Sequence, residues 1–253
     1  MLFNCMDKVN FVITMAGRAR RFAEAGLRAP EYMLEAGGRT LFEHALGSLP
    51  LGLPGKVVLA ALREHEREFG VKNFAEKRLR ELAPGKNWEL LLLDAPTRGQ
   101  AETALAAEAS LAGGEGLAIY NIDTAFSSPT LEGRLRDPAA RLDGVIGSFR
   151  LEGTDDKWSF AQAGPGGLVA RTAEKERISS DALTGFYHFS RASDFFGAAR
   201  AQIAAGSAVR GEFYVAPVYN ALIAAGGKFV LDQARELVPL GTPADLARLK
   251  GGA

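Results

Sequence analysis

Three arginines follow a small-residue turn near the start of the chain, in the segment TMAGRARRFAEAGLRAPEYM. The turn is Ala16-Gly17, directly after an apolar run, and Arg18, Arg20 and Arg21 come next. Backbone N–H groups in such a turn, and guanidinium groups beside it, can bind the oxygens of a triphosphate. The alternative is a surface turn whose arginines are merely solvated.

Glu31 is the unexpected residue of this segment, because a polyphosphate would favour a lysine there. A carboxylate about 4 Å from a phosphate costs about 4 kcal/mol at an effective dielectric constant of about 20. A working phosphate loop would therefore need Glu31 to turn away or a cation to compensate its charge, and Arg20 and Arg28 are the candidates. The residues alone leave open whether the loop still binds anions or has been disabled.

Asp123 ends the apolar stretch GLAIYNID. A carboxylate that leaves a buried strand is well placed to hold Mg²⁺, which binds few carboxylates together with phosphate oxygens. A turn or helix-cap aspartate is the competing interpretation.

The segment TAEKERISSDALTGFYHF supplies a charged pair, Glu174-Lys175, at the end of an expected strand. Gly185 lies within the next expected strand, where a missing side chain can let a ligand approach. A solvated surface pair is the alternative for the two charged residues.

The histidines share no metal-binding spacing. His44 and His65 are expected on helix surfaces, and His188 in a strand. The chain also contains no Gly-x-Ser-x-Gly elbow, no Walker lysine loop and no Gly-x-Gly-x-x-Gly fingerprint. The arginine turn, Asp123 and the charged pair therefore remain as the candidates for chemistry.

The elements that must position these residues follow from hydrophobic patterning. Buried strands are expected at 9–15, 56–62, 88–94 and 116–123, and later at 143–151, 158–164, 167–174 and 183–190. Helices are expected at 40–49 with Thr40 as N-cap, at 64–82 and 99–111, and near 191–205 and 212–225. The early alternation of strands and helices predicts an α/β layer fold with a largely parallel sheet. In such sheets ligands gather at the carboxyl ends of the strands.

Composition excludes several classes of function. The 253 residues include 30 basic and 30 acidic side chains, which gives no basic stripe for nucleic acid or for a membrane surface. The single cysteine, Cys5, rules out an intramolecular disulfide and fits a reducing compartment. No apolar run approaches the roughly 20 residues of a membrane-spanning helix. A cytoplasmic protein with one domain over residues 1–253 is expected.

The order of these segments resembles the sugar-1-phosphate nucleotidyltransferases, the pyrophosphorylase-like enzymes of the GT-A type nucleotide-diphospho-sugar transferase fold. Members open with an Ala-Gly-x-Gly-[ST]-Arg loop, then Pro-Lys, then a Gly-Lys-x-[LM] helix start. Here Ala19 stands for the second glycine and Arg20 for the serine or threonine. Glu31 stands for the lysine, which in the family helps to bind the phosphates.

Later segments carry the same resemblance. PTRGQAET is similar to the segment that holds the base, NIDT to the metal strand, and GEFYVAPVYNALI to a Gly-Glu-x-Tyr segment before a helix. PLGTPADL is similar to the near-terminal Gly-Thr-Pro-x-x-Leu. Ala216-Pro217 occupy the place where some relatives have a second metal-binding aspartate, so Glu212 or Asn220 would have to substitute.

The resemblance implies a fold and a set of roles. The fold is a Rossmann-like three-layer α/β/α domain with a mixed, mostly parallel central sheet, nucleotide-binding over about residues 1–125 and sugar-phosphate-binding over about 126–253. The implied site residues are, for the nucleotide, Ala16, Gly17, Arg18, Arg20, Gly99 and Gln100; for catalysis, Arg21, Asp123 and Lys175; for the sugar phosphate, Asn121, Glu174, Gly185, Tyr187 and Glu212; and for Mg²⁺, Asp123 and Asn220.

The implied reaction joins a nucleoside triphosphate to a sugar-1-phosphate and releases pyrophosphate. Two alternatives remain open at this point. One is a non-catalytic relative that binds a nucleotide or nucleotide sugar. The other is a glycosyltransferase on the same fold, although such enzymes usually carry Asp-x-Asp where this chain has Asn121-Ile122-Asp123. The base, the sugar and the oligomeric state do not follow from the sequence.

Overall fold

The computed structural model describes residues 8–137 and 141–251, and Cys5 lies outside them. Within these residues, nine strands form one mixed sheet in the order β10-β9-β11-β6-β1-β4-β5, with β8 paired to β11 and β12. The strands are β1 (Val9–Thr14), β4 (Val57–Leu62), β5 (Trp88–Leu93), β6 (Gly116–Asn121), β8 (Gly144–Arg150), β9 (Ser159–Ala163), β10 (Val169–Glu174), β11 (Asp181–Phe189) and β12 (Phe229–Gln233).

The centre of the sheet is parallel. β1 pairs in parallel with both β4 and β6, and β4 continues in parallel to β5. Phe11 and Ile13 pack into one hydrophobic core and Val12 into another, because successive side chains of a strand point to opposite faces. A continuous apolar run is therefore needed in β1, since helices cover both faces.

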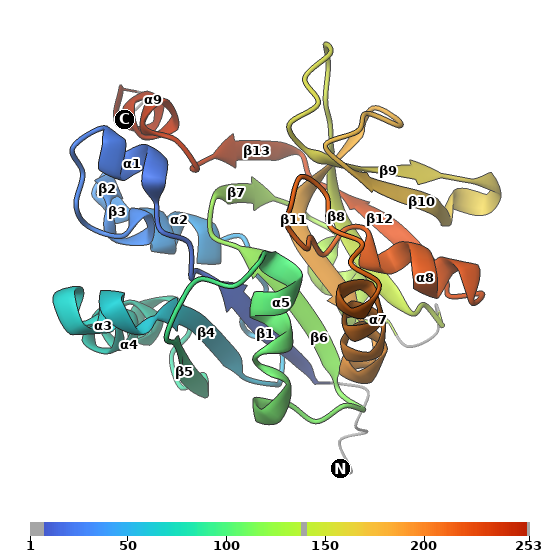
Figure 1. Ribbon diagram of the computed structural model, residues 1–253, viewed down its shortest axis with the longest axis horizontal. Helices are drawn as coiled ribbons and strands as arrows, with labels where there is room; N and C mark the ends of the chain where they lie inside the picture. The colour runs from blue at the N-terminus through green and yellow to red at the C-terminus, as the bar shows by residue number, and fades with distance from the viewer. Residues whose placement is uncertain (1–7, 138–140, 252–253) are drawn as a thin grey trace.

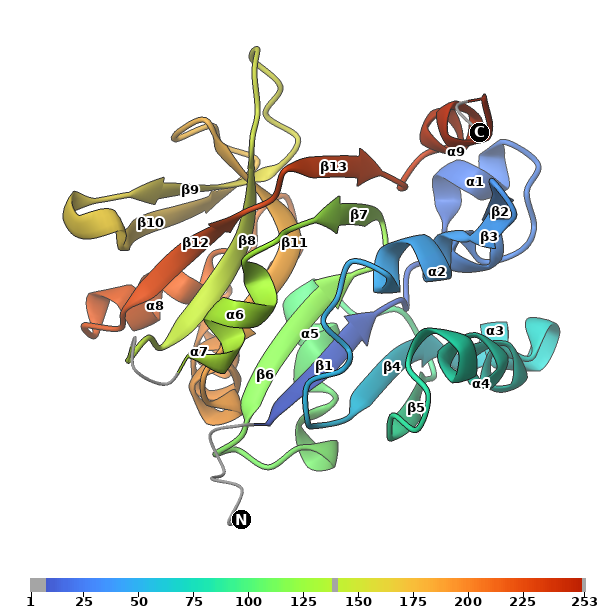
Figure 2. The same ribbon diagram turned by 180° about the vertical axis from the view of Figure 1, so that it is seen from behind.

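Helices on the two faces complete three layers (Figures 1 and 2). One face carries α2 (Leu41–Leu46), α4 (Val71–Leu82) and α6 (Leu131–Arg136), and the other carries α5 (Gln100–Leu105), α7 (Ala192–Ala204) and α8 (Val218–Ala224). The predicted N-cap of α2 is confirmed, since Thr40 Oγ1 accepts a hydrogen bond from the Glu43 N–H at 3.3 Å. The predicted α/β/α fold with a mixed sheet is also confirmed.

Antiparallel pairing dominates the second half of the sheet. β11 pairs antiparallel with β6, β8 and β9, and β9 pairs antiparallel with β10. β9 therefore separates β10, which ends just before Lys175, from β11, which carries Gly185.

Three predicted helices have different boundaries. The expected helix over 64–82 is two helices, α3 (Arg63–Phe69) and α4, because Gly70 between them adopts a left-handed conformation with φ 65°. The helix expected over 99–111 ends at Leu105 and is followed by a 3₁₀ turn, Glu108–Ser110. The helix expected over 212–225 begins only at Val218. His65 of α3 is buried rather than on a helix surface, and its Nδ1 lies 3.2 Å from the Tyr32 hydroxyl.

Several short elements near the carboxyl ends of the central strands were not predicted. They are α1 (Arg20–Glu24), a 3₁₀ turn (Glu31–Met33), β2 (Glu35–Ala36), β3 (Arg39–Thr40), β7 (Thr124–Ser127), β13 (Glu236–Pro239) and α9 (Pro243–Gly251). β13 pairs with β7, and α9 lies beside α1 and β2 (Figures 1 and 2). The C-terminal segment therefore reaches the edge of the sheet where ligands are expected.

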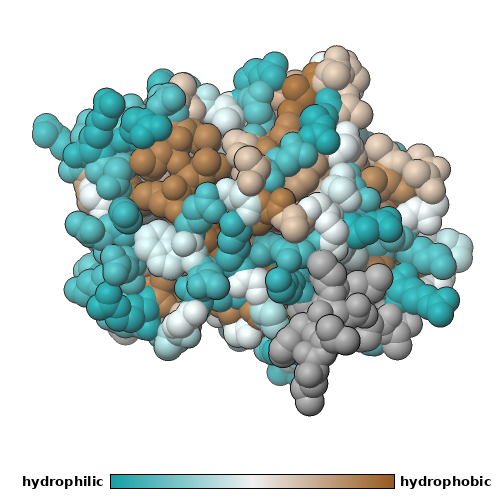
Figure 3. Space-filling view, turned by 90° about the horizontal axis from the view of Figure 1, so that it is seen from below, coloured by the Kyte–Doolittle hydropathy of each residue, from teal (hydrophilic) through white to brown (hydrophobic). Residues whose placement is uncertain are grey.

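The opposite end of the molecule is partly apolar on its surface. β5 forms one edge of the sheet, and its six residues are partly exposed. Figure 3 shows hydrophobic patches interrupted by polar side chains on this underside. No helix among the described residues is long and apolar enough to span a membrane.

Candidate active site

A cleft of about 1090 Å³ lies at the carboxyl ends of β1 and β6. Small-molecule sites usually measure roughly 300–1,000 Å³, so this cleft has room for more than one small ligand. The predicted site residues that line it are Ala16, Gly17, Arg18, Arg20, Arg21, Gly99, Gln100, Asn121, Asp123, Glu174, Lys175, Gly185, Tyr187 and Glu212. The fold thus brings residues from both halves of the chain to one place.

Asn220 is the predicted site residue that does not line the cleft. Its Oδ1 accepts a hydrogen bond from the Thr172 N–H, and its Nδ2 donates one to the Thr172 carbonyl, both at 2.9 Å. These bonds tie α8 to β10. The side chain is therefore engaged in holding the fold together, and the prediction of Asn220 as a metal ligand is corrected.

The arginine loop keeps the backbone shape of a glycine loop without its second glycine. Ala19 has φ 47° and ψ 36°, in the left-handed region, and it is the N-cap of α1. This conformation costs a residue with a Cβ about 1–2 kcal/mol. Arg18, Arg20 and Arg21 are exposed around the turn and line the cleft. The loop therefore presents three cations to any ligand in the cleft.

Glu31 also lines the cleft, half-buried. Burial and the neighbouring charge of Asp123 raise its pKa to about 7, and Arg21 partly counters the rise. Within the described residues its carboxylate has no hydrogen bond and no ion pair, and neither Arg20 nor Arg28 pairs with it. The expectation that Arg20 or Arg28 compensates Glu31 is wrong, since Arg21 is the cation whose charge reaches it.

Asp123 follows β6 and has an unsatisfied carboxylate. Its Oδ1 is buried and has no hydrogen-bond partner. The pKa of Asp123 is raised, mainly by burial and also by the charge of Asp245. A hydrogen bond from its own backbone N–H and the charge of Arg21 partly counter this rise. An orphaned carboxylate oxygen beside a polar cleft is the type of donor that a hard divalent cation takes, so this residue fits a Mg²⁺ ligand.

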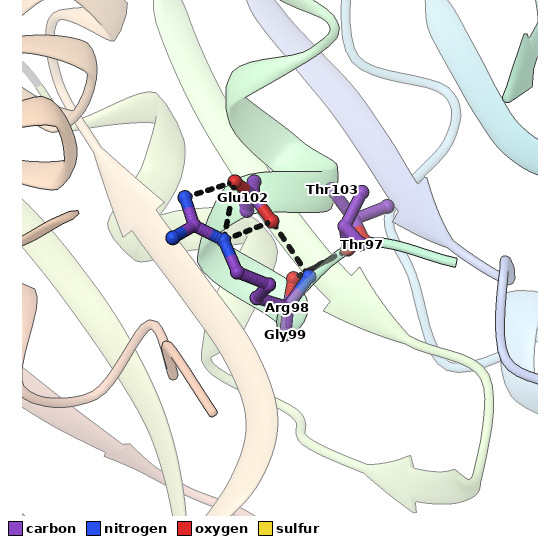
Figure 4. Close-up of polar contacts among 5 residues, drawn as sticks. All are labelled: Thr97, Arg98, Gly99, Glu102 and Thr103. Carbon is purple, nitrogen blue, oxygen red and sulfur yellow. Dashed lines mark hydrogen bonds and ion pairs between the residues drawn. The ribbon is translucent and has the colours of Figure 1, made fainter. Parts of the chain in front are cut away.

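The segment before α5 is a compact polar turn (Figure 4). The Arg98 guanidinium pairs with the Glu102 carboxylate at 2.6 Å, and the Arg98 N–H donates to the same carboxylate at 2.6 Å. The hydroxyls of Thr97 and Thr103 lie 2.6 Å apart, and Thr97 Oγ1 donates to the Gly99 carbonyl at 2.9 Å. These bonds fix the backbone on the side of the cleft where the resemblance places the base.

Gly99 joins this turn to the segment before α8. Its φ is 138°, and the Phe213 N–H donates to the Arg98 carbonyl at 2.8 Å, while the Ala101 N–H donates to the Phe213 carbonyl at 2.9 Å. Gln100 points back toward β1, since its Nε2 donates to Thr14 Oγ1 at 3.3 Å. The turn before α5 is therefore tied to both β1 and the Gly-Glu-x-Tyr segment.

Lys175 lies on the other side of the cleft, directly after β10. Its ammonium donates a hydrogen bond to the Tyr214 hydroxyl and lies 4.5 Å from the centre of the Tyr214 ring. Burial raises the pKa of Tyr214, and the nearby Glu212 raises it further. Lys175 also has a positive φ of 53°, which is uncommon for a residue with a side chain. Tyr214 was not predicted, although it lies in the GEFY motif.

Glu174 and Tyr187 are connected through a serine. Ser159 Oγ donates to the Glu174 carboxylate and lies 3.3 Å from the Tyr187 hydroxyl, which donates to it. Burial raises the pKa of Glu174, and the Ser159 hydrogen bond and Lys175 lower it. Ser159 was not predicted, since a serine at the start of a strand carries no distinguishing pattern.

Position 185 requires a glycine for a different reason from the one that the sequence suggested. A Cβ at this position would lie 1.8 Å from Asn121 Oδ1, and its φ is 86°. The missing side chain therefore makes room for the Asn121 amide at the end of β6. Gly185 still lines the cleft, but a protein side chain occupies the space beside it.

The C-terminal segment supplies further unpredicted residues. Thr242 Oγ1 donates to Asp245 Oδ2 at 2.6 Å, and Arg248 pairs with Asp245 Oδ1. All three line the cleft, together with Lys157 and Trp158 from the turn before β9. The motif PLGTPADL contains Thr242 and Asp245, so the sequence did offer a signal for these two.

Comparisons with known proteins place the chain. The nucleoside-diphosphate-sugar pyrophosphorylase from Vibrio cholerae RC9 is 32% identical over 95% of this chain and 99% of its own, with a TM-score of 0.79. UDP-glucose pyrophosphorylase, solved with UDP-glucose, shares the fold at 15% identity over 97% and 98% of the two chains, with a TM-score of 0.75. So does the inositol-1-phosphate CTP transferase of T. maritima, at 14% identity over 98% and 98%, with a TM-score of 0.71. No protein-family model and no curated protein matches the chain. The chain belongs to the sugar-1-phosphate nucleotidyltransferase family, the pyrophosphorylase-like proteins with the GT-A type nucleotide-diphospho-sugar transferase fold.

Proposed function

We propose that the protein transfers a nucleotide from a nucleoside triphosphate to a sugar-1-phosphate, giving a nucleotide sugar and pyrophosphate. The observation that carries this proposal is the single cleft in which the arginine loop, Asp123 and Lys175 meet. The nucleoside-diphosphate-sugar pyrophosphorylase at 32% identity supports the same reaction class.

The bond changes are simple, and positioning supplies most of the catalysis. An oxygen of the sugar-1-phosphate attacks the α-phosphorus, a new P–O bond forms, and the bond to the β-phosphate oxygen breaks. Arg18, Arg20 and Arg21 would bind the triphosphate and stabilise the negative charge that develops on pyrophosphate. Ala16 and Gly17 would offer backbone N–H groups to the same oxygens.

The turn before α5 would hold the base. Gly99 and Gln100 line the cleft, and the Arg98–Glu102 pair and the threonine hydroxyls keep their backbone in place. A rigid backbone at this position would offer N–H and C=O groups to a base edge in a fixed direction. The identity of the base would then depend on this fixed pattern together with the Gln100 amide.

The antiparallel half of the sheet would bind the sugar phosphate. Lys175 would pair with its phosphate, held in position by the Tyr214 hydroxyl. The proposed sugar contacts are Asn121, Glu174, Gly185, Tyr187 and Glu212. Glu174 and Tyr187 share Ser159, so these side chains would orient the hydroxyls of the sugar together.

Asp123 would hold Mg²⁺. Bound there, the ion would neutralise charge on the phosphate oxygens of the nucleotide. The buried, unpartnered Oδ1 of Asp123 supports this assignment. Arg21, whose charge lowers the pKa of Asp123, would help to keep the carboxylate ionised.

A non-catalytic relative that binds a nucleotide or nucleotide sugar is the second candidate. The observation that favours it is the Glu31 carboxylate, which lies in the cleft where the family has a phosphate-binding lysine. Such a protein would bind nucleotide sugars without turnover.

The test is pyrophosphate release from ATP, GTP, CTP, UTP and dTTP, each with a set of sugar-1-phosphates and Mg²⁺. Thermal shifts with the same nucleotides and with common nucleotide sugars are recorded in parallel, because a bound ligand stabilises the folded state. Pyrophosphate from one pair of substrates supports the transferase. A thermal shift with a nucleotide sugar and no pyrophosphate from any pair supports the non-catalytic relative.

A further inference from the structure

A second cavity, of about 610 Å³, lies next to the cleft. The residues that line both spaces are Lys157, Trp158, Pro239 and Arg248. Trp158 places this junction on the sugar-phosphate side, because the Lys175 N–H donates to the Trp158 carbonyl at 3.0 Å. The cleft itself, at about 1090 Å³, already has room for more than one small ligand. The second cavity therefore offers space that the reaction proposed above does not use.

Paired strands form much of the wall of this second cavity. Arg150 ends β8, and Arg235 follows β12, which pairs in parallel with β8. The Ala234 N–H donates to the Ser148 carbonyl and the Arg235 N–H to the Ser127 carbonyl of β7, both at 2.8 Å. β13 and the loop between β8 and β9 also line the cavity, and they lie side by side in Figures 1 and 2. Hydrogen bonds between strands therefore hold the shape of the cavity.

The cavity has an apolar part that contains an aromatic ring. Trp158 is partly exposed, and its ring meets the Phe149 ring edge-on, with the ring centres 5.0 Å apart. Further apolar lining comes from Leu151, Ala234 and Leu237. Small-molecule sites typically combine such walls with a few charged groups that fix the orientation of the ligand. The second cavity has the size and the composition of such a site.

The charged groups of this cavity are mainly cations. They are Arg150, Lys157, Arg235 and Arg248, with Asp155 as the carboxylate. Arg150 and Arg248 pair with carboxylates that do not line the cavity. Lys157 pairs with Asp155 at 2.9 Å, but their side chains are 66% and 40% exposed, and such exposed pairs contribute little. Arg235 is exposed and has no ion pair in the part of the chain that the structure describes. Its guanidinium group is therefore available to a carboxylate or phosphate of a ligand.

We infer that the second cavity binds an anionic substituent of the acceptor, so that the acceptor is a sugar-1-phosphate with a further phosphate or carboxylate. The first phosphate would lie at Lys175, the sugar ring would pass Trp158, and the second anion would pair with Arg235. This inference rests on the proposed nucleotidyl transfer for the role of the first phosphate. It adds a substrate class, which the proposed function leaves open.

The test measures the binding of three probes to the whole protein by calorimetric titration without nucleotide. The probes are glucose-1-phosphate, glucose-1,6-bisphosphate and glucuronic acid-1-phosphate, and the last two show whether phosphate or carboxylate is the preferred second anion. Wild type should bind at least one of these two about tenfold more tightly than glucose-1-phosphate, because it gains a charge-assisted hydrogen bond.

Arg235→Gln should abolish this preference and bind glucose-1-phosphate as wild type does, since Arg235 lines the second cavity and not the cleft. Arg67→Gln is the matched control, because Arg67 is an exposed arginine of α3 that lines neither space. This variant should keep the preference. Thermal unfolding of both variants verifies that the fold is intact.

Equal affinity of wild type for the three probes would overturn the inference. So would a preference that survives Arg235→Gln, or the absence of binding by all three probes. Failure of the inference can be told from failure of the proposed function. A preference that depends on Arg235, with no pyrophosphate from any substrate pair, sustains the anion site and removes the transferase. Pyrophosphate release with a singly phosphorylated sugar, and no preference for a second anion, does the reverse.

Discussion

A Cβ atom on Gly99 would lie 2.5 Å from the carbonyl oxygen of Phe213. This close approach joins the turn that is proposed to hold the base to the segment that carries Glu212 and Tyr214. The two halves of the cleft are therefore coupled at one glycine, and no other residue fits there without moving backbone.

Gly99→Ala tests this coupling. The substitution forces the Phe213 backbone away and places alanine at φ 138°, so we expect the free energy of unfolding to fall by about 1–3 kcal/mol. Nucleotide binding should weaken as well. Chemical denaturation and calorimetric titration measure both effects.

The control for this substitution is Gly197→Ala. Gly197 is exposed in α7 and has open space around its Cβ position. The change should stabilise the helix by about 0.5–1 kcal/mol. A neutral effect of Gly99→Ala would contradict the close approach.

Ala19→Gly tests the left-handed conformation of the arginine loop. Glycine adopts this conformation without a Cβ clash, so we expect a gain of about 0.5–1 kcal/mol in the free energy of unfolding. Ala23→Gly, at an exposed position of α1, should instead lose about 0.5–1 kcal/mol. Denaturant titration of both variants is the measurement, and destabilisation by Ala19→Gly would exclude a left-handed Ala19.

Lys175→Met tests the proposed contact with the sugar phosphate. Losing one charge-assisted hydrogen bond should cost roughly 1.5–3 kcal/mol, which corresponds to a rise of about 10- to 100-fold in KM for the sugar-1-phosphate. Affinity for the nucleoside triphosphate should change little. Lys228→Met, at an exposed lysine outside the cleft, is the control. An unchanged KM for the sugar-1-phosphate would remove Lys175 from the site.

His188 predicts a pH dependence of stability that is separate from activity. Burial lowers its pKa from 6.5 to about 4. Between these values the unfolded chain binds a proton that the folded chain does not, so the free energy of unfolding falls as the pH drops from about 6.5 to 4. The loss should reach about 3 kcal/mol at pH 4. Above pH 6.5, His188 should add no pH dependence to the free energy of unfolding.

The measurement is denaturant unfolding of wild type and His188→Leu across pH 4–8. The variant has no group to titrate at this position. The free energy of unfolding of wild type should therefore fall relative to that of the variant as the pH drops. Parallel curves at all pH values would show that His188 is not buried in its neutral form.

The sequence was informative where a residue's role is local. The apolar runs of β1, β4 and β6, and the Thr40 cap, follow from periodicity and from hydrogen bonding between near neighbours. Gly70 was missed as a break because a single glycine within a helical pattern is often tolerated. The short β7 and β13 were missed because their hydrogen-bonded pairing joins segments that are distant in the sequence.

The sequence predicted most of the residues that line the cleft, but not which side chains contact one another there. The motif order named Asp123, Lys175 and Gly185, yet only the pairing of β1 with β6 brings Asp123 to the same end of the sheet as the arginine loop that follows β1. Asn220 was misassigned because sequence order cannot tell a cleft residue from one that ties α8 to β10. These contacts depend on the packing of distant segments, which periodicity does not encode.

The most direct test of nucleotidyl transfer follows the α-phosphorus itself. Each nucleoside triphosphate, labelled at the α-phosphate, is incubated with sugar-1-phosphates, Mg²⁺ and either wild type or Asp123→Asn, and the products are separated. The label should move into a nucleotide sugar with wild type, with an equal amount of unlabelled pyrophosphate, and should stay in the triphosphate with folded Asp123→Asn. Label that remains in the triphosphate with wild type for every substrate pair, or that moves equally well with Asp123→Asn, would contradict the account.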